Sequence, residues 1–332
     1  MKGGVSLAIP CRADEPGLGA TLESLYAACR QPGLSAGLIR ELLVCINGVE
    51  SAESSAPLVA VRAFCARHNV YLQELQVTAE AVAPVADANM APATLSVSDD
   101  IPPRCVVLST KRRGKPLAWN ILWRQASGEN VLFCDADVRI DHEAILFLSA
   151  RLQSEPRLQL VAAREVPVLE GKGTIWGRMG ALGYRFDFGN AGGRLFLIRK
   201  TAFSGAMPED LLLEDAWLTV AVGRQRVAKE WQAKVYFLPP ATGRDYFAER
   251  VRTEGGKLQI RRAHAHLLRH GPIATYPWSR FFGQITVREY PLAVLGLLVR
   301  GVAHIWARLA LLHKGFYALY RPFRTTKQWA KS

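Results

Sequence analysis

The first 135 residues alternate between short, continuous apolar runs and longer stretches in which apolar residues recur at helical spacing. The runs predict strands over 5–9, 40–46, 70–77, 105–108 and 131–134, and the spaced stretches predict helices over 18–28, 57–68 and 117–125. In the second helix, Val59, Val61, Phe64 and Cys65 are expected to face inward. Strands that alternate with helices form a mostly parallel sheet with helices on both faces, so the predicted fold class is α/β.

The second half of the chain continues in the same style, without an internal repeat. The pattern predicts helices over 142–153 and 244–269, and strands over 158–164, 194–198 and 235–238. A further helix is expected to continue from Glu214-Asp215 through Trp217 and Val220 to Val222. Residues 79–104 break the rhythm, because they are rich in Ala, Pro, Ser and Asp and lack periodicity. We interpret them as an insertion loop or a mobile flap.

Two acids, Asp135 and Asp137, follow the apolar run that ends at Cys134. Unpaired carboxylates are costly in a core, so the strand is expected to end at Asp135, at the carboxyl edge of the sheet where α/β folds bind ligands. The two acids can share a Mg²⁺ or Mn²⁺ ion, or divide between a cation and a ribose hydroxyl. The alternative is that Asp135 caps the following turn and Asp137 is solvated.

Two further stretches are candidates for the same chemistry. The basic loop 111–116 lies one helix before the acids and can bring cations to phosphates at the same edge, or it is simply solvated. Glu214 and Asp215 repeat the theme of an apolar run followed by acids. Their alternative role is to cap a helix and interact favourably with its dipole.

The segment from residue 276 to 312 is apolar and is interrupted by basic residues, of which Arg300, His304 and Arg308 are four apart. From 280 to 332 the chain has nine Lys or Arg and one acid. We expect amphipathic helices in a membrane interface with these three side chains and Lys314, Arg321 and Arg324 toward anionic lipid. The alternative is a pair of helices packed on the core. The predicted domains are therefore 1–270 and 271–332.

Composition narrows the classes of partner. The 332 residues carry a formal net charge of +13, which favours an anionic partner such as nucleic acid, lipid or a phosphorylated substrate. Six cysteines form no C-x-x-C pair, which favours a reducing cytoplasm without a zinc site or disulfides. No uncharged apolar stretch of 18 residues occurs, so no ordinary transmembrane helix is predicted, and the first residues do not read as a signal peptide.

Several of these pieces occur in one order. They are Pro10 with Asp14, Asn47-Gly48, Gly114-Lys115 with Ala118 and Asn120, Asp135-Ala136-Asp137, Leu213-Glu214-Asp215, and Gln259 with Arg262. This order over residues 4–265 resembles family 2 glycosyltransferases, the inverting group with the Rossmann-like GT-A fold that includes cellulose, hyaluronan and ceramide-glucosyl synthases. Singly the motifs are weak, and their order is more specific.

The resemblance implies roles for these residues. Pro10, Arg12, Asp14 and Asn47 would form the nucleotide-base pocket, and Lys115 and Asn120 would lie beside the nucleotide. Asp135 and Asp137 would hold the ribose or diphosphate through Mg²⁺ or Mn²⁺, with Asp137 as the principal metal ligand. Asp215 would be the catalytic base, with Glu214 beside it, and Gln259 and Arg262 would belong to the motif whose arginine contacts the diphosphate.

Three positions depart from the family pattern. Asp14 replaces a glutamate, Ile46 stands where many members have a base-contacting acid, and Ala263 replaces a tryptophan. The base in the donor is therefore open, with a UDP-sugar favoured over a GDP-sugar. The missing tryptophan argues against a processive polysaccharide synthase.

The expected function is transfer of a sugar from a nucleotide-diphosphate sugar to a lipid or lipid-linked acceptor, at the cytoplasmic face of the cell membrane. Alternatives are a catalytically inactive, membrane-associated protein of the same fold and a sugar-phosphate nucleotidyltransferase. A nucleotidyltransferase would be expected to carry a glycine-rich loop near the N-terminus, and residues 10–17 of this chain do not form one. No nucleic-acid partner is expected, because the basic residues are spread and no recognised nucleic-acid motif occurs.

Overall fold

The computed structural model describes residues 4–35, 37–49, 55–77, 104–169, 171, 173–185, 191–204, 206–271, 273 and 278–313. The chain forms two compact units. Unit 1 comprises Met1–Arg164, Gly193–Glu209 and Glu230–Val235, and unit 2 comprises Glu165–Gly192, Asp210–Lys229 and Tyr236–Ser332. The predicted insertion 79–104 lies almost wholly outside the described residues and stays a prediction.

A nine-stranded sheet in the order β3-β4-β2-β1-β5-β8-β7-β9-β6 is the centre of unit 1, to which β7 and β9 contribute part of their length. The strands are β1 (Val5–Arg12), β2 (Ile39–Asn47), β3 (Tyr71–Gln76), β4 (Arg104–Thr110), β5 (Asn130–Cys134), β6 (Val138–Ile140), β7 (Leu160–Pro167), β8 (Leu195–Arg199) and β9 (Val227–Phe237). The pairings of β1 with β2 and β5, and of β4 with β2 and β3, are parallel. Strand β8 is antiparallel to β5 and β7. The prediction of an α/β fold with a mostly parallel sheet is confirmed.

Strand β1 extends to Arg12, three residues beyond its predicted end, and Pro10 lies inside it. Pairing with β5 stops at Ala8, whereas pairing with β2 continues to Arg12. A proline is tolerated where one side of a strand has lost its partner, because its missing N–H breaks no ladder there. Strand β9 begins at Val227, eight residues before its predicted start at Val235, and its first half is polar and partly exposed. That half carries no strong periodic signal.

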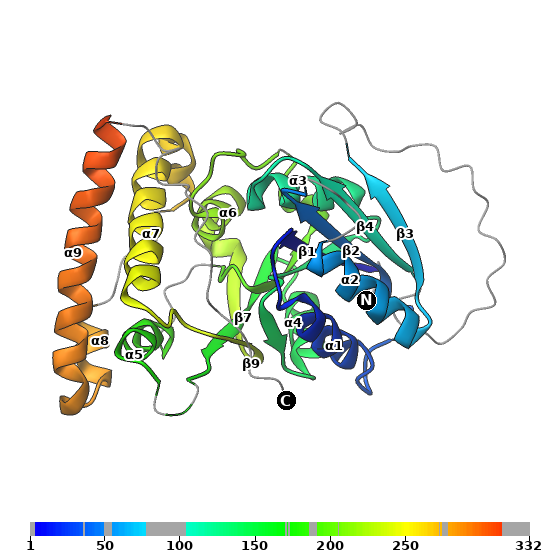
Figure 1. The fold of residues 1–332 in the computed structure, drawn as a ribbon, viewed down its shortest axis with the longest axis horizontal. Helices are drawn as coiled ribbons and strands as arrows, with labels where there is room; N and C mark the ends of the chain where they lie inside the picture. Colours follow the sequence, from blue (N-terminus) through cyan, green and yellow to red (C-terminus); the bar gives the residue numbers. More distant parts are fainter. Residues whose placement is uncertain are drawn as a thin grey trace. The chain divides into compact units, whose positions relative to one another are not determined.

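Four helices of unit 1 surround this sheet: α1 (Leu18–Cys29), α2 (Ala56–His68), α3 (Lys115–Gln125) and α4 (Ala144–Ser154) (Figure 1). Helix α3 packs on β1 and β2, while α1 contacts α2 and α4. In α2, Val61, Phe64 and Cys65 are buried as predicted, but Val59 is 55% exposed. The prediction for Val59 is wrong because residues 59 and 61 lie about 200° apart around a helix and cannot both face the core.

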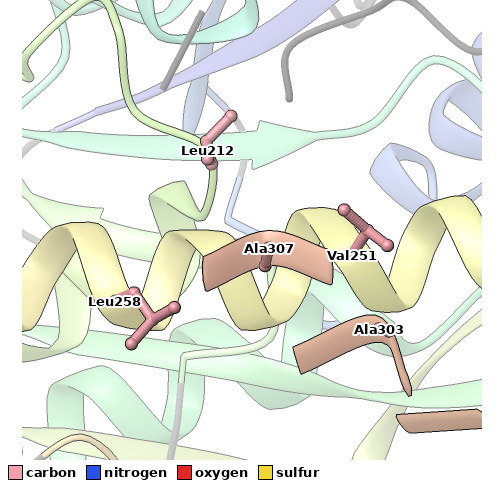
Figure 2. Close-up of a cluster of buried hydrophobic side chains, with 5 residues drawn as sticks. All are labelled: Leu212, Val251, Leu258, Ala303 and Ala307. Carbon is pink, nitrogen blue, oxygen red and sulfur yellow. The ribbon is translucent and has the colours of Figure 1, made fainter. Parts of the chain in front are cut away.

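Unit 2 consists mainly of helices. They are α5 (Ile175–Leu182), α6 (Glu214–Val222), α7 (Gly243–Ala263), α8 (Trp278–Gln284) and α9 (Tyr290–His313), with short 3-10 turns η2 (Gly183–Arg185), η4 (Arg224–Arg226), η5 (Ala265–His270) and η6 (Val287–Glu289). Helices α7 and α9, yellow and orange in Figure 1, run side by side. Figure 2 shows the cluster that joins them to the segment before α6. It consists of Leu212, Val251, Leu258, Ala303 and Ala307.

The C-terminal helices do not form a unit by themselves, because α9 packs on α7 within unit 2. The predicted boundary at residue 270 therefore does not coincide with a compact unit, and the domains 1–270 and 271–332 stay a prediction. Among the described residues, one helical segment, Val287–Leu311, is long and apolar enough to cross a membrane by length and composition alone, with a mean hydropathy of 1.5. The criterion of 18 consecutive uncharged apolar residues did not identify this segment, because Arg288, Arg300 and Arg308 interrupt it.

The predicted orientation of Arg300 and His304 is wrong. Both side chains face α7, where Arg300 Nε lies 2.8 Å and His304 Nδ1 lies 3.2 Å from the carboxylate of Glu254. Their spacing placed them on one face of α9, but the charge of Glu254 determines that this face is the inner one. Lys314, Arg321 and Arg324 lie outside the described residues.

Candidate active site

The turn Asp135–Asp137 lies at the carboxyl edge of the sheet, directly after β5, as the apolar run predicts. The backbone N–H of Asp135 donates to the carbonyl of Arg194, at 2.9 Å. Thr21 of α1 is completely buried beneath the turn. Its hydroxyl lies 2.9 Å from the carbonyl of Ala136, 2.7 Å from that of Val138 and 3.2 Å from the N–H of Val138. Helix α1 thus fixes the backbone that carries both acids.

Asp135 and Lys115 form the central ion pair of this edge, with Lys115 Nζ 2.8 Å from Asp135 Oδ1. Lys115 is the first residue of α3, so both side chains come from element termini that meet at the same edge. Burial and the negative charge of Asp137 raise the pKa of Asp135, although Lys115 and Arg194 act in the opposite direction. Asp135 is therefore already paired with a cation, whereas Asp137 is half-buried beside it.

Glu15 is a third carboxylate of this edge, and sequence reasoning missed it. It is only 9% exposed, and its Oε1 accepts from the backbone N–H of Gly17 at 2.9 Å. A Cβ atom on Gly17 would lie 3.0 Å from that oxygen and 3.2 Å from the Cα of Asp137, so the three residues are close together. Burial and the charge of Asp137 raise the pKa of Glu15 to about 7. The adjacent acids Asp14 and Glu15 could have indicated a further carboxylate at this edge, but only the fold shows that Glu15 is the one that turns inward.

Asp14 pairs instead with Arg12, whose Nη2 lies 2.6 Å away. Burial would raise the pKa of Asp14, but its hydrogen bond with Arg12 outweighs this and holds the pKa below the ordinary value. Both side chains are substantially exposed, at 36% and 59%, so they remain accessible to a ligand. Pro10 is buried within β1 and offers backbone geometry rather than an exposed contact.

Asn47, at the end of β2, joins two loops of this edge. Its Nδ2 donates to the carbonyl of Cys11 at 2.7 Å, and its Oδ1 accepts from the N–H of Gly114 at 3.2 Å. Gly48 has a φ of +79°, and a Cβ there would lie 2.9 Å from Cγ of Arg113. The Asn47-Gly48 turn therefore locks the 10–14 segment to the basic loop. A role for Asn47 in a base pocket works through this positioning.

Asn120 lies in α3 and is buried. It is 4% exposed, its Nδ2 donates to the carbonyl of Met207 at 2.7 Å, and its Oδ1 accepts from the N–H of Met207 at 2.8 Å. Both halves of its amide are thus used by one backbone residue. Asn120 thus anchors the 206–209 segment, and its place beside the nucleotide stays a prediction.

The oxygen-rich group Glu15, Asp135 and Asp137 suits a hard divalent cation such as Mg²⁺ or Mn²⁺. That Asp137 is the principal metal ligand stays a prediction. Among the described residues, one group of three has its ligand atoms within 4.8 Å of one another, and it lies elsewhere, at Asp141, His142 and Glu143. It is largely exposed at the start of α4, so it serves below as a control.

Replacing Thr21 by Val is expected to weaken both the fold of unit 1 and the metal site. The isosteric change leaves the polar backbone groups of Ala136 and Val138 buried without their partner, which costs about 1–3 kcal/mol for each unsatisfied group. Denaturant unfolding followed by Mn²⁺ titration measures the two effects. Thr21→Ser retains the hydroxyl and should restore the metal affinity. Equal affinity in all three proteins would contradict a positioning role for Thr21.

Glu214 and Asp215 are the first two residues of α6 in unit 2, and both are half-buried. Oδ1 of Asp215 accepts from the N–H of Ala216 at 2.7 Å, and Thr219 Oγ1 donates to the carbonyl of Asp215 at 2.8 Å. The N–H of Ala191 donates to Oγ1 of Thr219 at 2.8 Å. Both acids thus lie in the first turn of α6, as the dipole part of the alternative requires, but neither caps the helix, because the N-cap is Leu213 and no side chain caps it. The bond to Ala216 fixes the direction of the Asp215 carboxylate.

Helix α7 positions the segment that leads into these acids. Gln259 is completely buried, and its Oε1 accepts from the N–H of Leu212 at 3.0 Å while its Nε2 donates to the carbonyl of Asp210 at 2.9 Å. One turn earlier, Gly256 faces Leu213 so closely that a Cβ would lie 2.4 Å from the Cβ of Leu213. The buried Gln259 therefore acts on backbone rather than on a ligand, whereas Arg262 is exposed at the end of α7.

Gly256→Ala is expected to lower turnover by about 10-fold or more, because it pushes Leu213 and thereby moves Glu214 and Asp215. The intrinsic stability of the helix should increase, since Ala is preferred over Gly in a helix by about 1 kcal/mol. Steady-state kinetics and circular dichroism measure the two effects. The matched control is Gly301→Ala in α9, where a Cβ would meet nothing within 4 Å. Similar kinetics in the two variants would contradict the close contact.

Comparison with known proteins agrees with the resemblance inferred from the motifs. The family model for glycosyl transferase family 2 matches residues 84–207, which include Lys115, Asp135 and Asp137 but end before Glu214. A poly-β-1,6-N-acetyl-D-glucosamine synthase of Staphylococcus aureus is 25% identical over 224 residues, which are 62% of this chain and 49% of that protein. The chain thus spans about half the length of the curated relatives it matches.

Among solved structures, a mannosyltransferase from Pyrobaculum calidifontis in complex with GDP-mannose and Mn²⁺ has a TM-score of 0.53 with this chain. The two are 17% identical, and the match covers 96% of this chain and 83% of the other. At this identity the likeness concerns the fold. The predicted GT-A fold and the predicted resemblance to family 2 are confirmed.

Proposed function

We propose that this chain, which carries a family 2 glycosyltransferase domain, transfers a sugar from a nucleotide-diphosphate sugar to an acceptor hydroxyl with inversion at the anomeric carbon. The observation that carries the proposal is the Lys115–Asp135 pair with Asp137 at the carboxyl edge of the sheet. A cation and two carboxylates in this arrangement suit a diphosphate together with a divalent metal.

The reaction requires charge neutralisation on the leaving group. In the transfer, the acceptor oxygen forms a bond to the anomeric carbon as the bond from that carbon to the diphosphate breaks, and the nucleoside diphosphate leaves. Lys115 and Arg262 are the cations proposed to stabilise the negative charge that develops on it. Mg²⁺ or Mn²⁺ held by Asp137 supplies further neutralisation when bound.

The attacking hydroxyl must lose its proton, and Asp215 is the proposed acceptor, with Glu214 as the next candidate. One base and one direct displacement account for inversion. Arg12, Asp14 and the loops locked by Asn47 would hold the base and ribose. The resemblance favours a UDP-sugar, although the mannosyltransferase named above was solved with GDP-mannose.

The proposed acceptor is a lipid or a lipid-linked sugar, with the protein at the cytoplasmic face of the membrane. Two features support this choice. The relative in S. aureus is a polysaccharide synthase by name, and α9 has an apolar, exposed surface, as described in the next subsection. A soluble acceptor is the competing choice.

A screen of UDP-, GDP- and other nucleotide sugars with Mn²⁺ tests the proposal, with and without lipid extract, by following release of the nucleoside diphosphate. Lipid-stimulated release with one donor is the expected result. Donor binding without release in any condition would favour the catalytically inactive alternative. Formation of a nucleotide sugar from a sugar phosphate and a nucleoside triphosphate would instead identify a nucleotidyltransferase.

A further inference from the structure

Helix α9 presents an apolar stripe to the outside of unit 2. Its members are 48–64% exposed and recur every three or four residues, so they form one continuous face. This outer stripe consists of Val294, Leu298, Val302, Ile305, Trp306 and Leu309. Over the most apolar window of Val287–Leu311, only 17% is buried within the protein. Large apolar residues scattered singly need no explanation, but a contiguous patch marks an interaction surface.

The inner face of α9 carries Arg300 and His304 beside the buried Ala303 and Ala307. Glu254 of α7 is 7% exposed. Its carboxylate oxygens lie 2.8 Å from Nε of Arg300, 3.2 Å from Nδ1 of His304 and 3.1 Å from Nζ of Lys257. Burial would raise the pKa of Glu254, but Lys257 and Arg300 lower it to about 2, so the carboxylate stays charged. This cluster fixes the rotation of α9 about its axis. With Arg300 and His304 inside and large apolar residues outside, α9 differs from a surface helix of a soluble protein, which exposes mainly polar residues.

Two observations indicate what covers the outer stripe. Amphipathic aromatic side chains lie near its two ends, Tyr290 and Trp306, where a membrane–water interface favours them. Exposed cations, Arg288 and Arg308, flank it, and the nearby Glu289 is neutralised by Arg185 at 2.6 Å. Among the described residues of α9, Arg308 is the one charged residue on the exposed side. Hydrocarbon bordered by anionic headgroups matches this distribution of charge.

The packing of α9 on α7 distinguishes between lying on a bilayer and crossing it. The two helices contact each other through residues from Val251 to Leu258 and from Ala303 to Ala307, so α9 cannot enter hydrocarbon end-on without α7. Helix α7 exposes Arg244, Arg252, Arg261 and Arg262. Charged side chains of this kind are strongly unfavourable in the middle of a bilayer. Helix α9 therefore fits the bilayer surface, parallel to its plane.

We infer that the outer stripe of α9 inserts into the apolar boundary of a lipid bilayer and holds the enzyme on the membrane through apolar contact. This inference rests on the membrane association in the proposed function and specifies the surface responsible. It differs from the electrostatic attachment expected from the sequence, since Arg300 and His304 are occupied with Glu254. Burial of apolar area is insensitive to screening, whereas contact between surface charges and headgroups weakens as salt rises.

Vesicle flotation of the full chain tests the inference. The probes are neutral phosphatidylcholine vesicles and vesicles with added phosphatidylglycerol, each at low salt and at about 1 M NaCl. The variant combines Leu298→Ser, Val302→Ser and Ile305→Ser, whose side chains are all exposed and thus not needed for folding. The matched control combines Val59→Ser and Tyr71→Ser, which are 55% and 59% exposed in unit 1.

We expect the wild-type protein and the control to float with neutral vesicles at both salt concentrations, and the triple variant to lose about 10-fold or more of the bound fraction. Flotation only with anionic vesicles at low salt would overturn the inference in favour of the basic residues. A wild-type dimer in sedimentation without lipid, converted to a monomer by the triple change with flotation unaltered, would identify a second copy as the occupant.

Calorimetric titration of the same proteins with UDP or GDP and Mn²⁺ separates this inference from the proposed function. The triple variant should bind nucleotide as the wild type does, because the outer stripe is remote in sequence and in role from the proposed donor residues. Absent nucleotide binding in the wild type would overturn the proposed function while leaving the flotation result valid. Normal nucleotide binding without flotation would overturn the inference alone.

Discussion

Asp215→Asn is expected to lower turnover by roughly 10²-fold or more while donor affinity stays nearly unchanged. The amide cannot accept a proton at neutral pH, but its Oδ1 can still accept from the N–H of Ala216, as Oδ1 of Asp215 does at 2.7 Å. The start of α6 therefore stays intact. Release of nucleoside diphosphate under single-turnover conditions measures the chemical step, and calorimetry measures donor binding.

Glu214→Gln is the matched control for this prediction, because both acids occupy the first turn of α6 and favour its dipole equally. Loss of helix stabilisation would affect the two variants alike, whereas loss of the base affects one of them. Full turnover in Asp215→Asn together with a large loss in Glu214→Gln would transfer the role of base to Glu214. Equal losses in both would indicate that the acids act on the structure of α6.

The sequence predicts the position of the Asp135–Asp137 turn well, because two physical requirements coincide there. The run 131–134 is apolar enough to be buried on both faces, and two carboxylates cannot follow it into the core. The basic loop was predicted at the same edge for a topological reason, since parallel strands end on the same side. The ion pair between Lys115 and Asp135 has the expected partners.

Roles that depend on which side chains meet could not be predicted in the same way. Asn120 matches its motif, but its amide is used up by the backbone of Met207, 87 residues away. Glu15 and Asp14 are adjacent acids with equal propensities, and the turn buries one and exposes the other. In each case the decisive partner is distant in the chain, so local pattern carries no information about it.

The orientation of α9 shows the same difficulty on a larger scale. Periodicity groups Arg300, His304 and Arg308 on one side, which correctly predicts an amphipathic helix. The buried acid Glu254 in α7 draws Arg300 and His304 inward, whereas Arg308 stays exposed. The carboxylate of Glu254 pairs with Lys257, Arg300 and His304. Two basic residues of α9 that would be exposed on an ordinary surface helix therefore face inward. The amphipathic pattern thus predicts that the helix has two different faces, whereas charges on neighbouring helices decide which face is buried.

Asp137→Ala is expected to abolish metal-dependent binding of the nucleotide sugar in calorimetry. Asp137 is the proposed metal ligand itself, whereas Asp135 is held in its ion pair with Lys115, whose Nζ lies 2.8 Å from Oδ1 of Asp135. The loss should therefore exceed the roughly 10–100-fold typical of changing a partner outside the first coordination sphere. The control is Glu143→Ala in the exposed Asp141–His142–Glu143 cluster, which should leave Mn²⁺ affinity unchanged. A larger effect at Glu143 would place the metal there.

The stability of the same variant gives a readout independent of metal and substrate. Burial and the charge of Asp137 raise the pKa of Glu15 to about 7, so the folded protein holds a proton that an unfolded chain releases near pH 4.5. The stability that this proton provides is complete below pH 4.5 and is lost as pH rises through about 7. Removal of Asp137 lowers the pKa of Glu15, so the melting temperature of the variant should fall less between pH 5 and pH 8 than that of the wild type. An identical pH profile in the two proteins would mean that Asp137 does not act on Glu15, and the carboxylates of this edge would then be too far apart to share one cation.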